Sequence, residues 1–218
     1  MSSTKELDFQ QMLHQPTLAH EEGLRFLRGK GLMNSTLKQL ARDLSELDIE
    51  YSVIGAVALN QHGYRRFTED IDLLMTTAGL QKFTEELVGK GYRPAFPGAT
   101  RKFRATSENV PIEVIISGDY PGDGRPKSIR FPDPAEYSIE IDGIKTISLE
   151  KLIELKLASG LTGAGRRKDL ADVQELMKAL KLGVDLANRL DISVRPMYLE
   201  LYSEIEIAVD QQLAPDWE

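Results

Sequence analysis

Apolar side chains recur at helical spacing in several segments of the chain. After the pair Asn34-Ser35 they fall every three or four residues, which predicts a helix with its N-cap at that pair. The members of this stripe are Leu37, Leu40, Ala41, Leu44 and Leu47. The same spacing predicts further helices over residues 56–62, 80–90, 148–159, 166–181 and 195–213.

Short apolar or alternating runs between these helices predict β-strands. They cover residues 49–54, 70–75, 101–106, 111–117, 137–141 and 144–147. The last two runs flank Asp142-Gly143, a strong signal for a tight hairpin turn. Residues 118–134 are rich in proline and glycine and are predicted to form a loop.

The order of these elements predicts three parts. Residues 1–34 are polar and predicted to be helical in pieces, as an N-terminal helical extension. Residues 35–147 alternate strands and helices and are predicted to form an α/β domain, and residues 148–218 form a C-terminal helical portion.

Composition limits the class of protein. The chain has 218 residues, a formal net charge of -7 and no cysteine. The charge argues against a broad basic surface for duplex nucleic acid, although a local basic patch is compatible with it. Without cysteine, the chain has no disulfide, zinc–thiolate site or cysteine nucleophile. Because no apolar run approaches a membrane span and the N-terminus lacks a signal-peptide core, we expect a cytoplasmic protein without a membrane partner.

Asp70 and Asp72 lie two residues apart on the second predicted strand. Side chains at positions i and i+2 of a strand project from one face, so both carboxylates are expected to point to one place. Mg²⁺ takes one or two such carboxylates together with substrate phosphates and water. The alternative is a solvated edge or turn. Ile71, Leu73 and Leu74 favour a buried strand, where two carboxylates are costly without a cation.

Glu113 is the third candidate ligand, inside the otherwise apolar run Pro111–Ile116. A carboxylate from a neighbouring strand would complete a site in which two metal ions assist phosphoryl chemistry. The alternative is a charged residue on the solvent face of an edge strand. Taken alone, Glu113 does not decide between the two interpretations.

The turn Gly55-Ala56 follows the first predicted strand and opens a short helix. The first N–H groups of a helix can hold phosphate, although many strand-to-helix turns need glycine only for backbone geometry. Arg66 and Thr68 come just before the aspartates. Arg66 could neutralise a triphosphate, or it could pair with Asp70 or Glu69.

Lys156 falls within an apolar stripe of the helix predicted over residues 148–159. It could snorkel from the edge of the stripe or reach the phosphates of a substrate. Arg166 follows a glycine-rich turn and could bind phosphate or be solvated. Asp169 and Asp172 have sufficient structural explanations in the helix macrodipole and in an i,i+4 pair with Lys168.

Two blocks of sequence carry a resemblance to a known family. The first comprises residues 53–56, 63–66 and 68–74, and the second residues 147–156 and 166–173. Together they resemble the minimal nucleotidyltransferases of the polymerase-beta-like superfamily. In particular, they look like the bacterial branch that includes the AbiEii-type toxins of toxin–antitoxin systems.

This resemblance implies an α+β fold, a mixed β-sheet flanked by helices with a C-terminal helical portion. It implies Asp70, Asp72 and Glu113 as catalytic residues and ligands of Mg²⁺ or Mn²⁺. The residues that it places around the nucleotide are Gly55, Ala56, Arg66, Thr68, Lys156 and Arg166. Such enzymes transfer a nucleoside monophosphate from an NTP to a hydroxyl of an RNA, a protein or a small molecule. The toxins among them have an antitoxin protein as partner.

Two positions depart from the family pattern. Ala56 stands where the family usually has Gly or Ser, which removes a hydroxyl, and Glu113 is one methylene longer than the commoner Asp. The sequence therefore favours a Mg²⁺-dependent nucleotidyltransferase. It leaves as the alternative a catalytically weakened module of the same fold that binds nucleotide or a partner protein.

Overall fold

The computed structural model describes residues 9–213, and describes side chains as far as residue 208. Within that range the chain divides into two compact units. The first consists of residues 9–61, 65–117 and 132–147, and the second of residues 62–64, 118–131 and 148–213. The three-part division expected from the sequence stays a prediction, and residues 1–8 and 214–218 of it lie outside the described residues.

A seven-stranded mixed sheet forms the centre of the first unit, in the order β3-β4-β5-β2-β1-β7-β6. Its strands are β1 (Tyr51–Ile54), β2 (Ile71–Met75), β3 (Tyr92–Pro94), β4 (Lys102–Ala105), β5 (Pro111–Ile116), β6 (Ser138–Ile141) and β7 (Ile144–Ile147). The pairs β1–β7 and β2–β5 are parallel, and the other pairs are antiparallel. The α+β class and the mixed sheet are confirmed. All strands except the three-residue β3 are predicted by the sequence.

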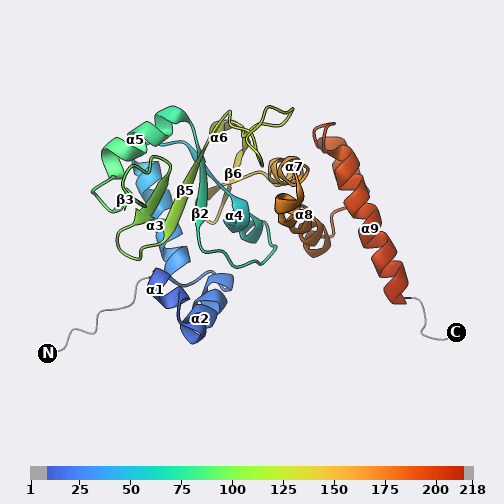
Figure 1. Ribbon diagram of the computed structural model, residues 1–218, viewed down its shortest axis with the longest axis horizontal. Coiled ribbons are helices and arrows are strands. Elements are labelled where there is room, and N and C mark those ends of the chain that lie inside the picture. Colours follow the sequence, from blue (N-terminus) through green and yellow to red (C-terminus); the bar gives the residue numbers. More distant parts are fainter. Residues whose placement is uncertain (1–8, 214–218) are drawn as a thin grey trace. The chain divides into compact units, whose positions relative to one another are not determined.

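Helices cover this sheet. In the first unit they are α1 (Phe9–Leu13), α2 (Pro16–Leu27), α3 (Leu32–Glu46), α4 (Gly55–Gln61), α5 (Thr77–Leu87) and α6 (Pro134–Tyr137). Figure 1 shows α3 behind the central strands β2 and β5. The apolar side chains of α3 and α5 share one buried cluster with the central strands, which confirms the expectation of a sheet flanked by helices.

The central strands have one core face and one more polar face. Apolar side chains of the core face alternate along each strand and are buried: Tyr51, Val53, Ile71, Leu73, Met75, Ile112, Val114 and Ile116. Because side chains of a strand alternate between faces, Asp72 and Glu113 lie on the opposite face. Both are half-buried there.

The start of α3 differs from the sequence prediction. The helix begins at Leu32, not after Asn34-Ser35, and the residue before it is Gly31, with a φ of +96°. The buried carboxylate of Glu22 accepts hydrogen bonds from the N–H groups of Leu32, at 2.6 Å, and Met33, at 3.4 Å. A carboxylate distant in sequence thus satisfies N–H groups of the first turn, which a search for a local N-cap cannot reveal.

The second unit is helical. Its helices are α7 (Leu149–Gly160), α8 (Arg167–Leu180) and α9 (Arg195–Leu213), with 3₁₀ segments η1 (Ala164–Arg166) and η2 (Val184–Arg189). These three α-helices are predicted by the sequence to within two residues at each end. An added Cβ at Gly160 would lie 2.4 Å from Leu170 Cδ2, so α7 and α8 pack closely there. Within the described range, no helix is long and apolar enough to cross a membrane.

Candidate functional site

β1 ends against the carboxylate of Asp72. Gly55, the residue after β1, has a φ of +65°, in the left-handed region that favours glycine. An added Cβ at Gly55 would lie 2.0 Å from Asp72 Oδ2 and 3.0 Å from Asp72 Cγ. Both the backbone conformation and this contact disfavour a side chain at position 55, because an added Cβ would displace the Asp72 carboxylate. The first residue of α4 therefore passes directly beside the Asp72 carboxylate.

The strand register aligns Asp72 with Glu113. In the antiparallel pair, Asp72 lies opposite Ile54, and in the parallel pair it lies beside Glu113. Aligned positions on adjacent strands share a face and are about 4.8 Å apart. Glu113 is 42% exposed and pairs with Lys102 Nζ at 3.2 Å. The sheet therefore holds two carboxylates side by side, with a lysine on the outer side of the second one.

Asp70 lies one residue before β2, which begins at Ile71. The strand alternation that predicts a shared face for the two aspartates therefore begins after Asp70. Its carboxylate accepts a hydrogen bond from Thr68 Oγ1 at 2.7 Å. Among the described residues, no three His, Cys, Asp or Glu side chains form a group that could hold a metal ion. The structure thus makes Asp72 and Glu113 neighbours but does not gather all three acids into one ligand set.

Asn60 joins α4 to the loop that carries Arg66 and Thr68. Its Nδ2 donates to the carbonyl oxygens of Ala56, at 2.8 Å, and Arg66, at 2.5 Å. Its Oδ1 accepts from the backbone N–H of Arg66 at 3.0 Å. The backbone of Arg66 is therefore fixed to the same short helix that begins at Gly55 and contains the buried Ala56.

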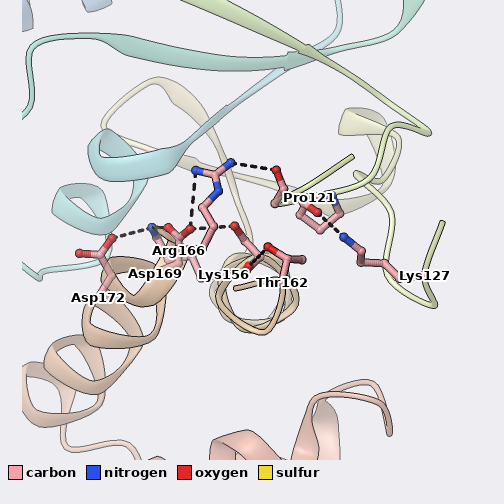
Figure 2. Close-up of polar contacts among 9 residues, drawn as sticks. Pro121, Lys127, Lys156, Thr162, Arg166, Asp169 and Asp172 are labelled. Atoms are coloured by element: carbon pink, nitrogen blue, oxygen red, sulfur yellow. Dashed lines mark hydrogen bonds and ion pairs between the residues drawn. The ribbon is translucent and has the colours of Figure 1, made fainter. Parts of the chain in front are cut away.

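Lys156, in the second unit, is enclosed by two carboxylates of α8. Its Nζ donates to Asp172 Oδ2 at 2.7 Å and to Asp169 Oδ1 at 3.2 Å (Figure 2). Ser159 Oγ donates a further hydrogen bond to Asp169 Oδ2 at 2.7 Å. The side chains of Lys156, Asp169 and Asp172 are 9%, 10% and 6% exposed. Lys156 does not snorkel to solvent. The macrodipole and Lys168 are therefore not a sufficient explanation for the two aspartates, which hold a buried lysine.

Arg166 joins this cluster from its solvent side. Its Nη1 lies 3.9 Å from Asp169 Oδ2, and its Nη2 donates to the carbonyl oxygen of Gly122 at 3.2 Å (Figure 2). The Arg166 side chain is 46% exposed. Arg166 therefore connects the start of α8 to the loop of residues 118–131.

Comparisons with solved structures find similarity at low sequence identity. The crystal structure of ANT(2″)-Ia in complex with adenylyl-2″-tobramycin aligns with a TM-score of 0.49 at 14% identity, over 80% of this chain and 99% of that chain. JHP933 from Helicobacter pylori aligns with a TM-score of 0.40 at 19% identity, over 80% and 72%. An antigenic nucleotidyltransferase-like protein from Paracoccidioides brasiliensis gives 0.44 at 18% identity, over 68% and 75%. No protein-family model and no curated protein matches the sequence. At these values the similarities do not assign an activity.

The site in the first unit therefore rests on its own residues. It offers two adjacent carboxylates, a backbone turn that approaches one of them without a side chain, and an arginine whose backbone is fixed nearby. Sequence reasoning missed Asn60 and the pairing of Lys102 with Glu113. The second could be found by aligning the predicted strands 101–106 and 111–117 as a hairpin. An asparagine near the end of a short helix carries no such signal.

Proposed function

We propose that this chain is a nucleotidyltransferase, which transfers a nucleoside monophosphate from an NTP to a hydroxyl acceptor with the help of Mg²⁺ or Mn²⁺. The observation that carries the proposal is the contact between Gly55 and Asp72. A Cβ at Gly55 would collide with the Asp72 carboxylate, so the first residue of α4 lies directly beside a carboxylate. Phosphate and a divalent cation are the partners that such a combination suits.

The residues present fit a divalent cation. Asp72 and Glu113 offer carboxylate oxygens from adjacent strands, and Mg²⁺ needs only one or two protein carboxylates when phosphates and water complete its shell. A bound cation would neutralise charge on the phosphates of the NTP. We therefore assign Asp72 and Glu113 to the cation and propose Asp70, whose carboxylate accepts a hydrogen bond from Thr68, as a further ligand.

The remaining roles follow from position and charge. Backbone N–H groups of Gly55 and Ala56 would bind phosphate oxygens, and the Arg66 guanidinium would offset their negative charge. Glu113, which is 42% exposed, would accept the proton of the acceptor hydroxyl. Lys156 is paired within its own unit, and we assign it to holding α7 against α8 rather than to the phosphates. Arg166 keeps an exposed guanidinium and stays a proposed contact to the nucleotide.

The test is transfer of label from α-³²P-labelled NTPs, with Mg²⁺ or Mn²⁺, to RNA, protein and small hydroxyl acceptors. We expect Asp72→Asn to reduce transfer by at least about 100-fold, because it weakens binding of the cation that would stabilise charge on the reacting phosphate. Glu69→Gln is the matched control, since Glu69 is an exposed acid next to Asp70. Equal labelling by the wild type and Asp72→Asn would contradict the proposal.

One observation favours a second candidate function. Glu113 is already paired with Lys102, and Ala56 brings no hydroxyl to the turn. Both features suit a module that binds nucleotide or a partner protein without turnover. Calorimetry with NTPs, followed by an assay for pyrophosphate, distinguishes the two functions. Binding of an NTP without release of pyrophosphate supports the second candidate.

We further propose that the transferase acts as the toxin of a toxin–antitoxin system, on the basis of the sequence resemblance to AbiEii-type toxins. It includes an antitoxin protein as partner. We expect growth arrest when the wild type is expressed and normal growth with Asp72→Asn. Normal growth with both proteins would refute the toxin role and leave the proposed chemistry untouched.

A further inference from the structure

A pocket of about 390 Å³ lies within the first unit. Its walls come from the α2–α3 corner, the last turns of α4, Arg65, and the β6–β7 turn. None of the residues assigned above to the metal or the phosphates lines it. The volume falls at the lower end of the range for small-molecule sites, about 300–1,000 Å³.

The charges around this pocket are not balanced. Three exposed cations line it, Arg28, Lys38 and Arg65, against one exposed acid, Asp142. In the part of the chain that the structure describes, none of the three cations has an ion-pair partner. Like charges that converge without counterions in a chain of net charge -7 favour an anionic ligand. Arginine and lysine together are typical of phosphate recognition.

The other groups of the pocket suit a nucleoside. Apolar side chains from three different elements, Leu37, Val57 and Ile144, form part of its wall, so one side of the pocket is apolar, as the site of a base would be. The amide of Gln61 has no hydrogen-bond partner among the described residues, so it can both donate to and accept from a base edge. Asp142 is the kind of acceptor that binds ribose hydroxyls in nucleotide sites.

We infer that this pocket binds a nucleoside monophosphate, with the phosphate at Arg28, Lys38 and Arg65, the ribose near Asp142 and the base beside Gln61. The ligand is either the free mononucleotide or the 5′-phosphorylated end of an RNA strand, which present the same chemistry. The site is separate from the proposed transferase centre and does not depend on it. Asn60 contacts both regions, because it lines the pocket and holds the backbone of Arg66.

The experiment titrates the full chain with AMP, GMP, CMP and UMP by calorimetry in EDTA, which removes divalent cations. The test variant is Arg28→Glu/Lys38→Glu. The matched control is Lys30→Glu, because Lys30 is exposed, lies beside Arg28 in sequence and does not line the pocket. We expect at least one mononucleotide to bind, and its Kd to rise at least about tenfold in the test variant, since charge-assisted contacts to phosphate are lost. We expect little change in the control.

Further measurements distinguish a free mononucleotide from an RNA end, and this pocket from the transferase centre. A 5′-phosphorylated RNA trinucleotide that binds while free mononucleotides do not would identify the RNA end as the ligand. Unchanged binding in Asp72→Asn places the ligand away from the transferase centre, whereas an equal loss in that variant would overturn the inference. Gln61→Ala, which keeps all charges, should weaken binding and alter the preference among bases, and it replaces the double variant if that protein does not fold.

Three other results would overturn the inference. The first is that neither the mononucleotides nor the RNA binds. The second is an equal loss of affinity in Lys30→Glu. The third is that inorganic phosphate binds as tightly as the best mononucleotide. The last would show that the nucleoside part contributes nothing.

Discussion

Replacing Gly55 with alanine tests whether the position of the Asp72 carboxylate matters for activity, because it should move that carboxylate with little effect on the stability of the fold. The added methyl would lie 2.0 Å from Asp72 Oδ2, where an ordinary contact is at least 3.4 Å. Because Oδ2 ends a flexible side chain, we expect the carboxylate to move away rather than the sheet to open. Gly55→Ala therefore displaces the proposed metal ligand without changing its chemistry.

The two consequences of Gly55→Ala differ in size. A residue with a Cβ in the left-handed region costs about 1–2 kcal/mol, which lowers the melting temperature by a few degrees in a chain of this length. Misplacing a reacting group by about 1 Å can reduce an enzymatic rate about 100-fold. We therefore expect a modest loss of stability and a large loss of nucleotidyl transfer.

Gly98→Ala provides the matched control. Gly98 has a φ of +83°, and nothing lies within 4 Å of a Cβ added there. It should show the same backbone cost and full activity. The assays are thermal unfolding, transfer of labelled NMP, and binding of Mn²⁺ by calorimetry. If Gly55→Ala transfers label and binds Mn²⁺ as Gly98→Ala does, the position of Asp72 against the turn has no functional role.

Two further predictions concern buried charges. Lys156→Met leaves the carboxylates of Asp169 and Asp172 buried without their lysine and should lower the free energy of unfolding by about 3–5 kcal/mol. The control is Lys178→Met, which breaks an exposed ion pair with Glu175 and should lower the free energy of unfolding in denaturant titrations by less than about 1 kcal/mol. Equal losses in the two variants would show that the buried cluster around Lys156 does not stabilise the fold. Burial raises the pKa of the Glu22 carboxyl above its usual 4.5, so between that value and its raised pKa the folded state binds more protons than the unfolded state. As pH rises through this window, the free energy of unfolding should therefore fall more in the wild type than in Glu22→Gln. Parallel plots of the free energy of unfolding against pH for the two proteins would contradict this prediction.

Much of the secondary structure could be predicted from local pattern. Residues 195–213 have bounds that match α9, and the hairpin around Asp142-Gly143 forms with both turn residues at positive φ. These elements depend on neighbours in sequence, which a periodicity or a turn signal captures. The start of α3 depends instead on Glu22, ten residues before Leu32, and no local pattern includes that contact.

In the candidate site too, features that depend on nearby residues could be predicted, and features that depend on distant residues could not. Asp72 and Gly55 could be identified from the sequence, because a strand, a glycine turn and a second strand in close succession bring them together. The alignment of Asp72 with Glu113 depends on the register of two strands that are distant in sequence. A shift of one residue would have turned Glu113 to the core face. Asp70 lies one residue before β2, so strand alternation alone does not fix the direction of its carboxylate, and its role as a ligand stays a prediction.

Lys156 shows why a residue that violates a pattern is informative before its role is known. Its place in an apolar stripe signals that a buried cation must have partners, because an unpaired charge in a protein interior is too costly to persist. The sequence could not identify those partners: a free phosphate and a pair of aspartates satisfy the same requirement. Only the packing of α7 against α8, with Gly160 allowing close approach, brings Asp169 and Asp172 to within 3.2 Å and 2.7 Å of the lysine. The three groups together carry one net negative charge, so Arg166, 3.9 Å from Asp169, completes the balance and ties the start of α8 to the same cluster.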